Sequence, residues 1–354
     1  MAFPPVPSTS KTQIRAAGDL LASGSGSIGT TEQARGLLAE WRACHLLPLD
    51  AFATDLQQRL ARLGIDAIVA LRLKRLFRIV EKLTQAPTMN ATTMQDIAGL
   101  RAIASKFEDV GRIVDDYLDN PPTFADAPEI RDYTAVPKDG GYRSVHLVFR
   151  YKDLSPSAYD GLRVELQVRT DPQHLWASAV EITGMWNGQR VKYDEGDPAW
   201  TEFFALVAEM IARREFTPAA EAYAGINDED VRSQLVASER KLDAVNVMRR
   251  MARSMPKVEF DDEFTAHPIG SFLLLKLDQT RQQLIIESYD KDSQEDALLA
   301  YADEEQRVTF VDGDVAPVLV WVNSAARLHD AYRSFFQDII PFADLLVQLL
   351  VARE

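Results

Sequence analysis

The segment LRVELQVRT (162–170) constrains the fold most, because apolar and polar residues alternate in it with a period of two. Successive side chains of a strand point to opposite faces of its sheet, so the two kinds of residue separate. The apolar face holds Leu162, Val164, Leu166 and Val168, and the polar face holds Arg163, Glu165, Gln167 and Arg169. Such a strand predicts a sheet with one buried face. Its other face is either solvated or lines a site for a charged ligand.

Further segments complete an α+β pattern. YRSVHLVFRY (142–151) also alternates with period two, and LRAIAS (100–105) is a short β-like run. Helical spacing of apolar residues predicts helices over 11–22, 32–45, 49–63, 66–84, 109–118, 172–186 and 198–215. We therefore expect a mixed β-sheet flanked by helices, of the α+β class.

Charge and composition exclude several classes of protein. The formal net charge of −14 argues against a general nucleic-acid binder, which needs concentrated Lys and Arg. A single cysteine rules out an internal disulfide framework and disfavours a structural zinc site. No apolar run approaches 18 residues and no secretory signal is evident, so we expect a cytoplasmic protein with no membrane partner.

One local basic cluster stands out against the acidic total. Between residues 59 and 82 there are two acidic residues and seven basic ones, namely Arg59, Arg62, Arg72, Lys74, Arg75, Arg78 and Lys82. Most of them fall in the helix predicted over 66–84. That helix either presents a solvated face or packs on one side and meets phosphate on the other.

The ends of the chain differ from its centre. Residues 1–31 predict a flexible lead and a first helix, with Thr30 or Thr31 capping the next one. A boundary is expected near 216–228, and residues 225–354 carry 14 basic and 24 acidic residues. In this C-terminal part the sequence predicts helices over 228–253, 292–305 and 324–338 and a helical tail. It also predicts a hairpin of strands 271–278 and 283–290 and a further strand at 317–323. This acidic α/β C-terminal module shows no catalytic cluster and is expected to be regulatory or oligomerising, so homo-oligomerisation stays open.

The central segment resembles a known family. The strings that carry the resemblance are ALRLKRL (70–76), MQDIAGLRAI (94–103), RDYTAVPKDGGYRSVH (131–146), VELQVRT (164–170) and WASAVE (176–181). Their order and spacing resemble the RelA/SpoT synthetase domain of alarmone synthetases, over roughly residues 45–215. The resemblance implies a nucleotidyltransferase-like synthetase domain over 32–224, in a standalone form without the family's hydrolase half. Alarmone hydrolysis is therefore not expected.

The resemblance implies a pyrophosphokinase. Family members transfer the β,γ-pyrophosphate of ATP to the ribose 3′-hydroxyl of GTP or GDP, which yields (p)ppGpp. Phosphoryl transfer needs charge neutralisation, usually with Mg²⁺ held by one or two carboxylates and by the substrate phosphates. By resemblance Asp96 and Glu165 are the catalytic and metal-binding carboxylates, and Glu165 either assists the metal or deprotonates the 3′-hydroxyl.

The resemblance also assigns the binding residues. Arg72, Lys74 and Arg101 match positions that contact ATP, and Lys138, Tyr142 and His146 match positions that contact the acceptor, with Tyr142 stacked on guanine. The Gly140–Gly141 pair suits a tight turn that requires positive φ. Supporting roles are expected for Arg131, Arg143, Gln167 and Arg169.

Structural alternatives stay open at these positions. Asp96 could sit in an ion-paired loop, with Arg101 as its partner, while Tyr142 and His146 could be core residues. The chain also departs from the family, with Gly140 in place of an asparagine and Ile182 in place of a histidine after Glu181. These departures leave two further hypotheses: a toxin-type member that modifies tRNA 3′ ends or adenine nucleotides, and a non-catalytic nucleotide-sensing scaffold.

Overall fold

The computed structural model describes residues 9–153, 159–186, 197–254, 272–278, 283–290, 293–307, 317–322 and 327–351. Its strands are β1 (Ala67–Leu73), β2 (Ala98–Ala104), β3 (Glu129–Asp132), β4 (Val145–Arg150), β5 (Arg163–Thr170), β6 (Phe272–Asp278), β7 (Gln283–Tyr289) and β8 (Val318–Val322). Its N-terminal and central helices are α1 (Lys11–Ser23), α2 (Ile28–Ala43), α3 (Leu46–Leu63), α4 (Leu76–Gln85), α5 (Phe107–Asp119), α6 (Asp171–Trp186) and α7 (Pro198–Arg214). The later helices are α8 (Asp228–Leu242), α9 (Ala244–Ser254), α11 (Gln294–Arg307), α12 (Leu328–Ala331), α13 (Arg333–Phe336) and α14 (Ile340–Leu350).

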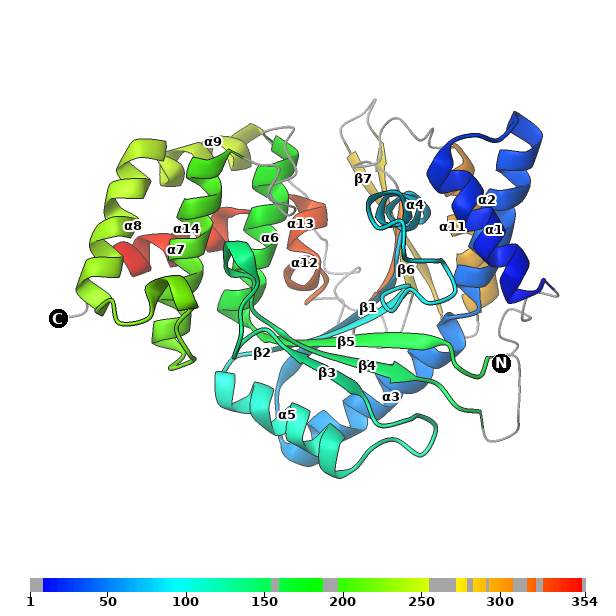
Figure 1. Ribbon diagram of the computed structural model, residues 1–354, viewed down its shortest axis with the longest axis horizontal. Coiled ribbons are helices and arrows are strands. Elements are labelled where there is room, and N and C mark those ends of the chain that lie inside the picture. Colours follow the sequence, from blue (N-terminus) through cyan, green and yellow to red (C-terminus); the bar gives the residue numbers. More distant parts are fainter. Residues whose placement is uncertain are drawn as a thin grey trace.

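The strands of the described residues form one sheet in the order β3-β4-β5-β2-β1-β8-β6-β7 (Figure 1). β2 and β5 pair in parallel and the other neighbours pair antiparallel, so the sheet is mixed. Helices α3 and α5 lie on one side of the sheet, and α6 and α7 rise from the other (Figure 1). The expected α+β class is confirmed.

The helix predicted over 66–84 is wrong, because its first half is strand β1 and only Leu76–Gln85 is helical. Residues 67–73 read AIVALRL, and successive residues of this strand lie on opposite faces of the sheet. Val69, Leu71 and Leu73 are buried in the core, and they pair with β2 along the whole strand. The apolar residues whose three- and four-residue spacing predicted one helix thus belong partly to a strand and partly to a short helix. Arg72 therefore projects from the sheet itself.

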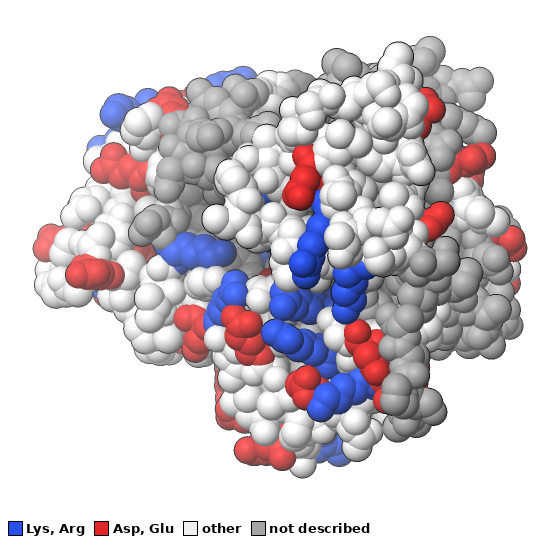
Figure 2. Space-filling view, turned by 45° about the vertical axis from the view of Figure 1, so that its right-hand side comes forward, with Lys and Arg blue, Asp and Glu red and all other residues white. Residues whose placement is uncertain are grey.

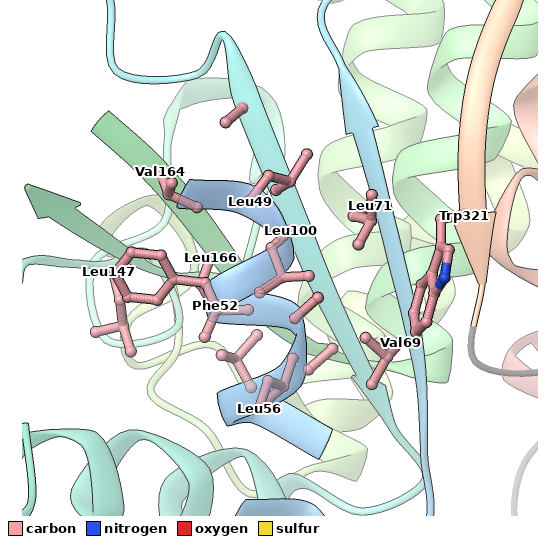
Figure 3. Packing of buried hydrophobic residues seen from close by; sticks show 14 of the residues in the cluster. Leu49, Phe52, Leu56, Val69, Leu71, Leu100, Leu147, Val164, Leu166 and Trp321 are labelled. Carbon is pink, nitrogen blue, oxygen red and sulfur yellow. The ribbon is translucent and has the colours of Figure 1, made fainter. Parts of the chain in front are cut away.

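The buried face of the sheet is packed against α3. The predicted stripe on this helix is confirmed, since Leu49, Phe52 and Leu56 are all fully buried. They meet Leu100 of β2 and Leu166 of β5 in the main hydrophobic core (Figure 3). The alternation predicted for residues 162–170 is confirmed, because all four apolar residues are buried at 2% exposure or less.

The C-terminal strands extend the same sheet from β1. Strand β8 pairs with β1 through Arg72 and Val320, and β6 and β7 follow as the predicted antiparallel hairpin. A buried ion pair joins Arg42 of α2 to Glu305 of α11, with Nη2 and Oε2 2.7 Å apart. The predicted boundary near residue 224 stays a prediction.

Several helix bounds differ from those expected. Helix α2 begins at Ile28, capped by Ser27 in place of the threonines that follow it. The single helix predicted over 228–253 is two helices, because Asp243 adopts a left-handed conformation with φ of 52°. The segment predicted as one helix over 324–338 forms the short helices α12 and α13 in its described part. Within the described residues no helix is both long and apolar enough to cross a membrane.

Candidate active site

Strand register gathers the polar residues on the face of the sheet opposite α3. Residues paired across neighbouring strands lie on the same face, so each register row can be followed across the sheet. One row runs Arg131, His146, Gln167, Arg101 and Ala70, and the next runs Glu165, Gly99 and Arg72. A third row holds Arg169, Ile103 and Ile68. Residues far apart in the sequence thus meet on one polar face.

A cavity opens on this face around Gly99. Its lining includes Arg72, Arg101 and Glu165 from the sheet and Asp96 from the loop before β2. Gly99 places no side chain between Glu165 and Arg72, which leaves room for a ligand at that point. The predicted catalytic carboxylates and all three predicted ATP contacts, Arg72, Lys74 and Arg101, therefore share one cavity.

Asp96 is held by two lysines rather than by Arg101. Its Oδ2 lies 2.8 Å from Nζ of Lys74 on one side, and its Oδ1 lies 2.9 Å from Nζ of Lys82 on the other. Burial opposes ionisation of this carboxyl, but the two ammonium groups outweigh it and hold the pKa of Asp96 well below its usual range. Lys82 of α4 joins the site although sequence reasoning gave it no role there.

Glu165 ends a chain of hydrogen bonds that starts at Tyr142. The Tyr142 hydroxyl lies 2.8 Å from Nε2 of His146, and Nδ1 of His146 lies 3.0 Å from Oε1 of Glu165. Gln167 donates to the other carboxylate oxygen at 2.8 Å. An ionised carboxylate only accepts, so Nδ1 of His146 carries a proton, and in the neutral ring Nε2 accepts from Tyr142. Burial alone would raise the pKa of Glu165, but the bonds from His146 and Gln167 lower it below its ordinary value.

Three arginines make the face electropositive. Within the described part of the chain, none of Arg72, Arg101 and Arg169 forms an ion pair with a carboxylate. Burial, followed by the neighbouring charge of Arg101, lowers the pKa of Arg169 to about 9. The buried Nε atoms of Arg101 and Arg169 have no hydrogen-bond partner among the residues that the structure describes. Lys and Arg side chains gather in a band across one face of the molecule (Figure 2). Clustered positive charges of this kind favour an anionic ligand such as a polyphosphate.

An aromatic cluster borders the face beside His146. The ring centroids of Tyr133 and Tyr142 lie 5.9 Å apart, and each ring meets the His146 ring edge-on. The Lys138 ammonium lies 4.3 Å from the centroid of Tyr133 and 5.2 Å from that of Tyr142. This grouping offers aromatic rings and a cation within one small region, which suits a purine nucleotide.

The expected glycine turn precedes this cluster. Gly140 and Gly141 have φ of 80° and 95°, so the predicted requirement for positive φ is confirmed. A Cβ on Gly141 would lie 2.6 Å from Cβ of Ala208, whereas a Cβ on Gly140 would meet nothing within 4 Å. Gly141 is therefore needed both for its backbone conformation and for the close approach of α7.

Replacing each of these glycines by alanine should lower the free energy of unfolding by a different amount. Gly140→Ala should lower the free energy of unfolding by about 1–2 kcal/mol, the cost of a left-handed alanine. Gly141→Ala should cost about 2–5 kcal/mol, because overpacking against Ala208 adds to that strain. Urea unfolding of both variants measures the difference. Equal losses in the two variants would contradict the close packing of Gly141 on α7.

Of the four predicted supporting residues, Gln167 lines the cavity, and Arg131, Arg143 and Arg169 lie outside its lining. Arg131 is on the polar face at the edge strand β3, where it is exposed and pairs with Glu129 at 2.7 Å. Arg143 is turned away from the face and is buried, with Nη2 3.3 Å from Oε2 of Glu209 on α7. The remaining predicted residues lie on the polar face or at its border, as described above.

The C-terminal segment contributes a residue that sequence reasoning missed. The buried Tyr332 lines the cavity, and its hydroxyl donates to the carbonyl of Leu71 at 2.6 Å and to that of Trp321 at 3.2 Å. Arg101 donates to the carbonyl of Ala331 at 3.0 Å. Tyr332 thus lines one side of the cavity although it lies 165 positions beyond Gln167, the nearest other lining residue in the sequence, and no local motif indicates its role.

The donor set limits which metal the site could hold. Among the described residues no group of three or more His, Cys, Asp and Glu side chains is arranged to bind a metal ion. The cavity offers two carboxylates, Asp96 and Glu165. Mg²⁺ is often bound by only one or two carboxylates and takes its other ligands from water and substrate phosphates. The residues fit such an ion and do not fit a metal held by protein alone.

Comparison with known proteins gives consistent matches to this region. Residues 71–187 match the family described as the region found in RelA / SpoT proteins. The chain is 38% identical over 109 residues to the GTP pyrophosphokinase YjbM of Bacillus subtilis, covering 30% of this chain and 51% of the relative. It is 34% identical over 131 residues to the uncharacterized protein Rv1366 of Mycobacterium tuberculosis, covering 37% of this chain and 44% of the relative.

Among solved structures, the small alarmone synthetase 1 of Bacillus subtilis bound to its product pppGpp superposes with a TM-score of 0.41. Its sequence identity is 26%, and the match covers 49% of this chain and 89% of that one. The chain spans about half the length of the curated relatives it matches. The family match contains every predicted site residue, from Arg72 to Arg169, and the resemblance drawn from the motifs is confirmed.

Proposed function

We propose that this chain, which contains the region found in RelA and SpoT proteins, is a pyrophosphokinase that makes (p)ppGpp from ATP and GTP or GDP. The relative YjbM, named a GTP pyrophosphokinase, supports this class of reaction. The proposal rests on one observation: Glu165, Asp96 and three arginines that form no ion pair with any carboxylate of the described residues meet on a single face of the sheet. Such a face can neutralise a polyphosphate and deprotonate a hydroxyl beside it.

The reaction that we propose forms one bond and breaks one. The ribose 3′-hydroxyl oxygen of the guanine nucleotide attacks the β-phosphorus of ATP, and the bond from that phosphorus to the α-phosphate bridging oxygen breaks. AMP leaves with the electron pair of the broken bond, and the hydroxyl proton passes to the Glu165 carboxylate. The hydrogen bond from His146 orients that carboxylate, as a second group often orients a general base.

The two nucleotides would occupy different parts of the face. Arg72, Arg101 and Lys74 lie around the cavity and are placed to hold the phosphates or base of ATP. Tyr142 and Lys138 lie in the aromatic cluster, which suits the acceptor purine. Asp96 and Glu165 would hold Mg²⁺, which when bound neutralises phosphate charge. Lys74 and Lys82 keep Asp96 ionised for that role.

The hydrogen bonds to Glu165 predict how the reaction depends on pH. A base acts when deprotonated, so activity that depends on Glu165 is retained above its pKa and falls as the pH decreases through it. Since the pKa of Glu165 in the free protein is lowered from 4.5, its acid limb in the kcat/KM profile should lie below pH 4.5. His146→Ala removes the strongest of the stabilising contacts, so the limb should move to higher pH. An unmoved limb in the pH profile of kcat/KM would contradict this assignment.

Transfer of label tests the proposed function. Purified protein is incubated with Mg²⁺ and ATP labelled at the β-phosphate, and GTP, GDP, ATP alone or bulk tRNA is offered as acceptor. We expect label on the guanine nucleotides. Label on tRNA, or on an adenine nucleotide other than the labelled ATP, would show that the acceptor differs from the one proposed, while the proposed transfer chemistry would stand. Nucleotide binding without any transfer would overturn the proposal in favour of a sensing scaffold.

A further inference from the structure

A buried ion pair lies directly behind the aromatic cluster. Arg143 follows Tyr142 in the chain, and its guanidinium meets Glu209 of α7. The two residues are 3% and 1% exposed, so both charges are removed from water. A buried pair of this kind is weak support for stability, because well-packed apolar residues of similar volume often serve as well. Its placement therefore calls for another explanation.

The Arg143 guanidinium ties together the two segments that carry the aromatic rings. Its Nη1 donates to the carbonyl of Thr134 at 2.8 Å and to that of Pro218 at 2.9 Å. Thr134 is the neighbour of Tyr133, and Arg143 is the neighbour of Tyr142. One side chain thus links the backbone beside both rings.

The Glu209 carboxylate in turn holds that guanidinium in place. It also accepts from Nε of Arg213 at 2.9 Å and from the backbone N–H of Ala220 at 3.0 Å. On the same helix, Ala208 is the residue against which Gly141 is closely packed. Helix α7 therefore supports the segment before Tyr142 by a steric contact and the segment after it by an ion pair.

From these contacts we infer that Glu209 is a positioning residue for the acceptor nucleotide. Through Arg143 it sets the spacing of Tyr133 and Tyr142, which form two walls of one purine site with Lys138 beside them. This inference rests on the proposed function, since the acceptor is placed there by that proposal. Neither Arg143 nor Glu209 touches substrate, and both act through the rings.

The test compares Glu209→Gln with Arg213→Gln. Both substitutions remove one partner of the same ionic contact, but only Glu209 contacts Arg143. In Glu209→Gln we expect the KM for GDP, and the Kd for GDP measured by calorimetry, to rise about tenfold, while the KM for ATP stays within about twofold. In Arg213→Gln all three constants should stay within about twofold. An equal rise in the constants for both nucleotides, or none, would overturn the inference.

A double variant separates positioning from stability. Glu209→Gln alone leaves Arg143 buried without its charged partner, which should lower Tm. Adding Arg143→Gln removes that uncompensated charge, so Tm should recover toward the wild type. The Kd for GDP should stay raised, because the glutamine side chain is shorter than that of arginine and its amide does not reach the two carbonyls that Nη1 of Arg143 contacts. Recovery of GDP affinity together with Tm would show a structural role only and overturn the inference.

Failure of the proposed reaction would be distinguishable. If the wild type binds GDP but transfers no pyrophosphate, the proposed function fails and the Kd comparison still decides the role of Glu209. If the wild type transfers pyrophosphate and the variants keep normal GDP constants, the inference alone fails. A wild type that does not bind GDP overturns both.

Discussion

Glu165→Gln and Asp96→Asn should each lower kcat for pyrophosphate transfer by about a hundred- to ten-thousandfold. Glutamine keeps the size of Glu165 but cannot take the proton of the attacking hydroxyl. Asparagine at position 96 removes the negative charge that faces Lys74 and Lys82, and with it the carboxylate proposed to bind Mg²⁺. Steady-state kinetics at saturating ATP and GDP measures both effects.

The matched control is Asp116→Asn. Asp116 is also a buried carboxylate held by two basic residues, Arg59 and Arg62, but it lies on α5 on the far side of the sheet. Its replacement should lower Tm and leave kcat within about twofold. Near-normal kcat in both site variants would contradict the assignment. An equal loss in Asp116→Asn would show that the site variants act through stability.

Arg72→Ala should raise the KM for ATP by about a hundredfold and change the KM for GDP by less than about threefold. A charge-assisted contact to phosphate contributes roughly 1.5–3 kcal/mol, which corresponds to a factor of about 10–150 in affinity. Arg72 lines the cavity beside Gly99, away from the aromatic cluster proposed for the acceptor. Initial rates with each nucleotide varied in turn separate the two KM values.

Arg62→Ala provides the comparison for loss of charge alone. Arg62 belongs to the same basic stretch of sequence, but its guanidinium is occupied by Asp116. Its loss should leave both KM values unchanged within about twofold. A rise in the KM for GDP equal to that for ATP in Arg72→Ala would contradict the proposed division of the face into donor and acceptor parts.

The polar face was predictable where a single strand or turn carries the signal. Strict alternation in 162–170 placed Glu165, Gln167 and Arg169 on one face, and the structure has them there. Gly140 and Gly141 predicted positive φ, because few other residues adopt it readily. These features depend on local backbone geometry, which the sequence encodes directly.

Features that depend on contacts between distant segments could not be predicted from the sequence. Residues 67–73 are rich in residues that fit either a helix or a strand, and pairing with β2 and β8 decides the outcome. Lys82 of α4 contacts Asp96 because the loop that joins α4 to β2 brings these two residues together. Tyr332 is held at the cavity by hydrogen bonds to the carbonyls of Leu71 in β1 and of Trp321 in β8. Strand β8 is remote in sequence from β1, and no local sequence pattern indicates this position.

Phosphorus-31 NMR of a mixture of protein, Mg²⁺, ATP and GDP tests the central claim most directly, because it identifies which bond of ATP is broken. Attack on the β-phosphorus predicts that AMP and guanosine 3′,5′-bis(diphosphate) accumulate in equal amounts, and that neither forms with Glu165→Gln. Appearance of ADP together with GTP, or full turnover in Glu165→Gln, would contradict the claim that this face of the sheet transfers pyrophosphate to a 3′-hydroxyl.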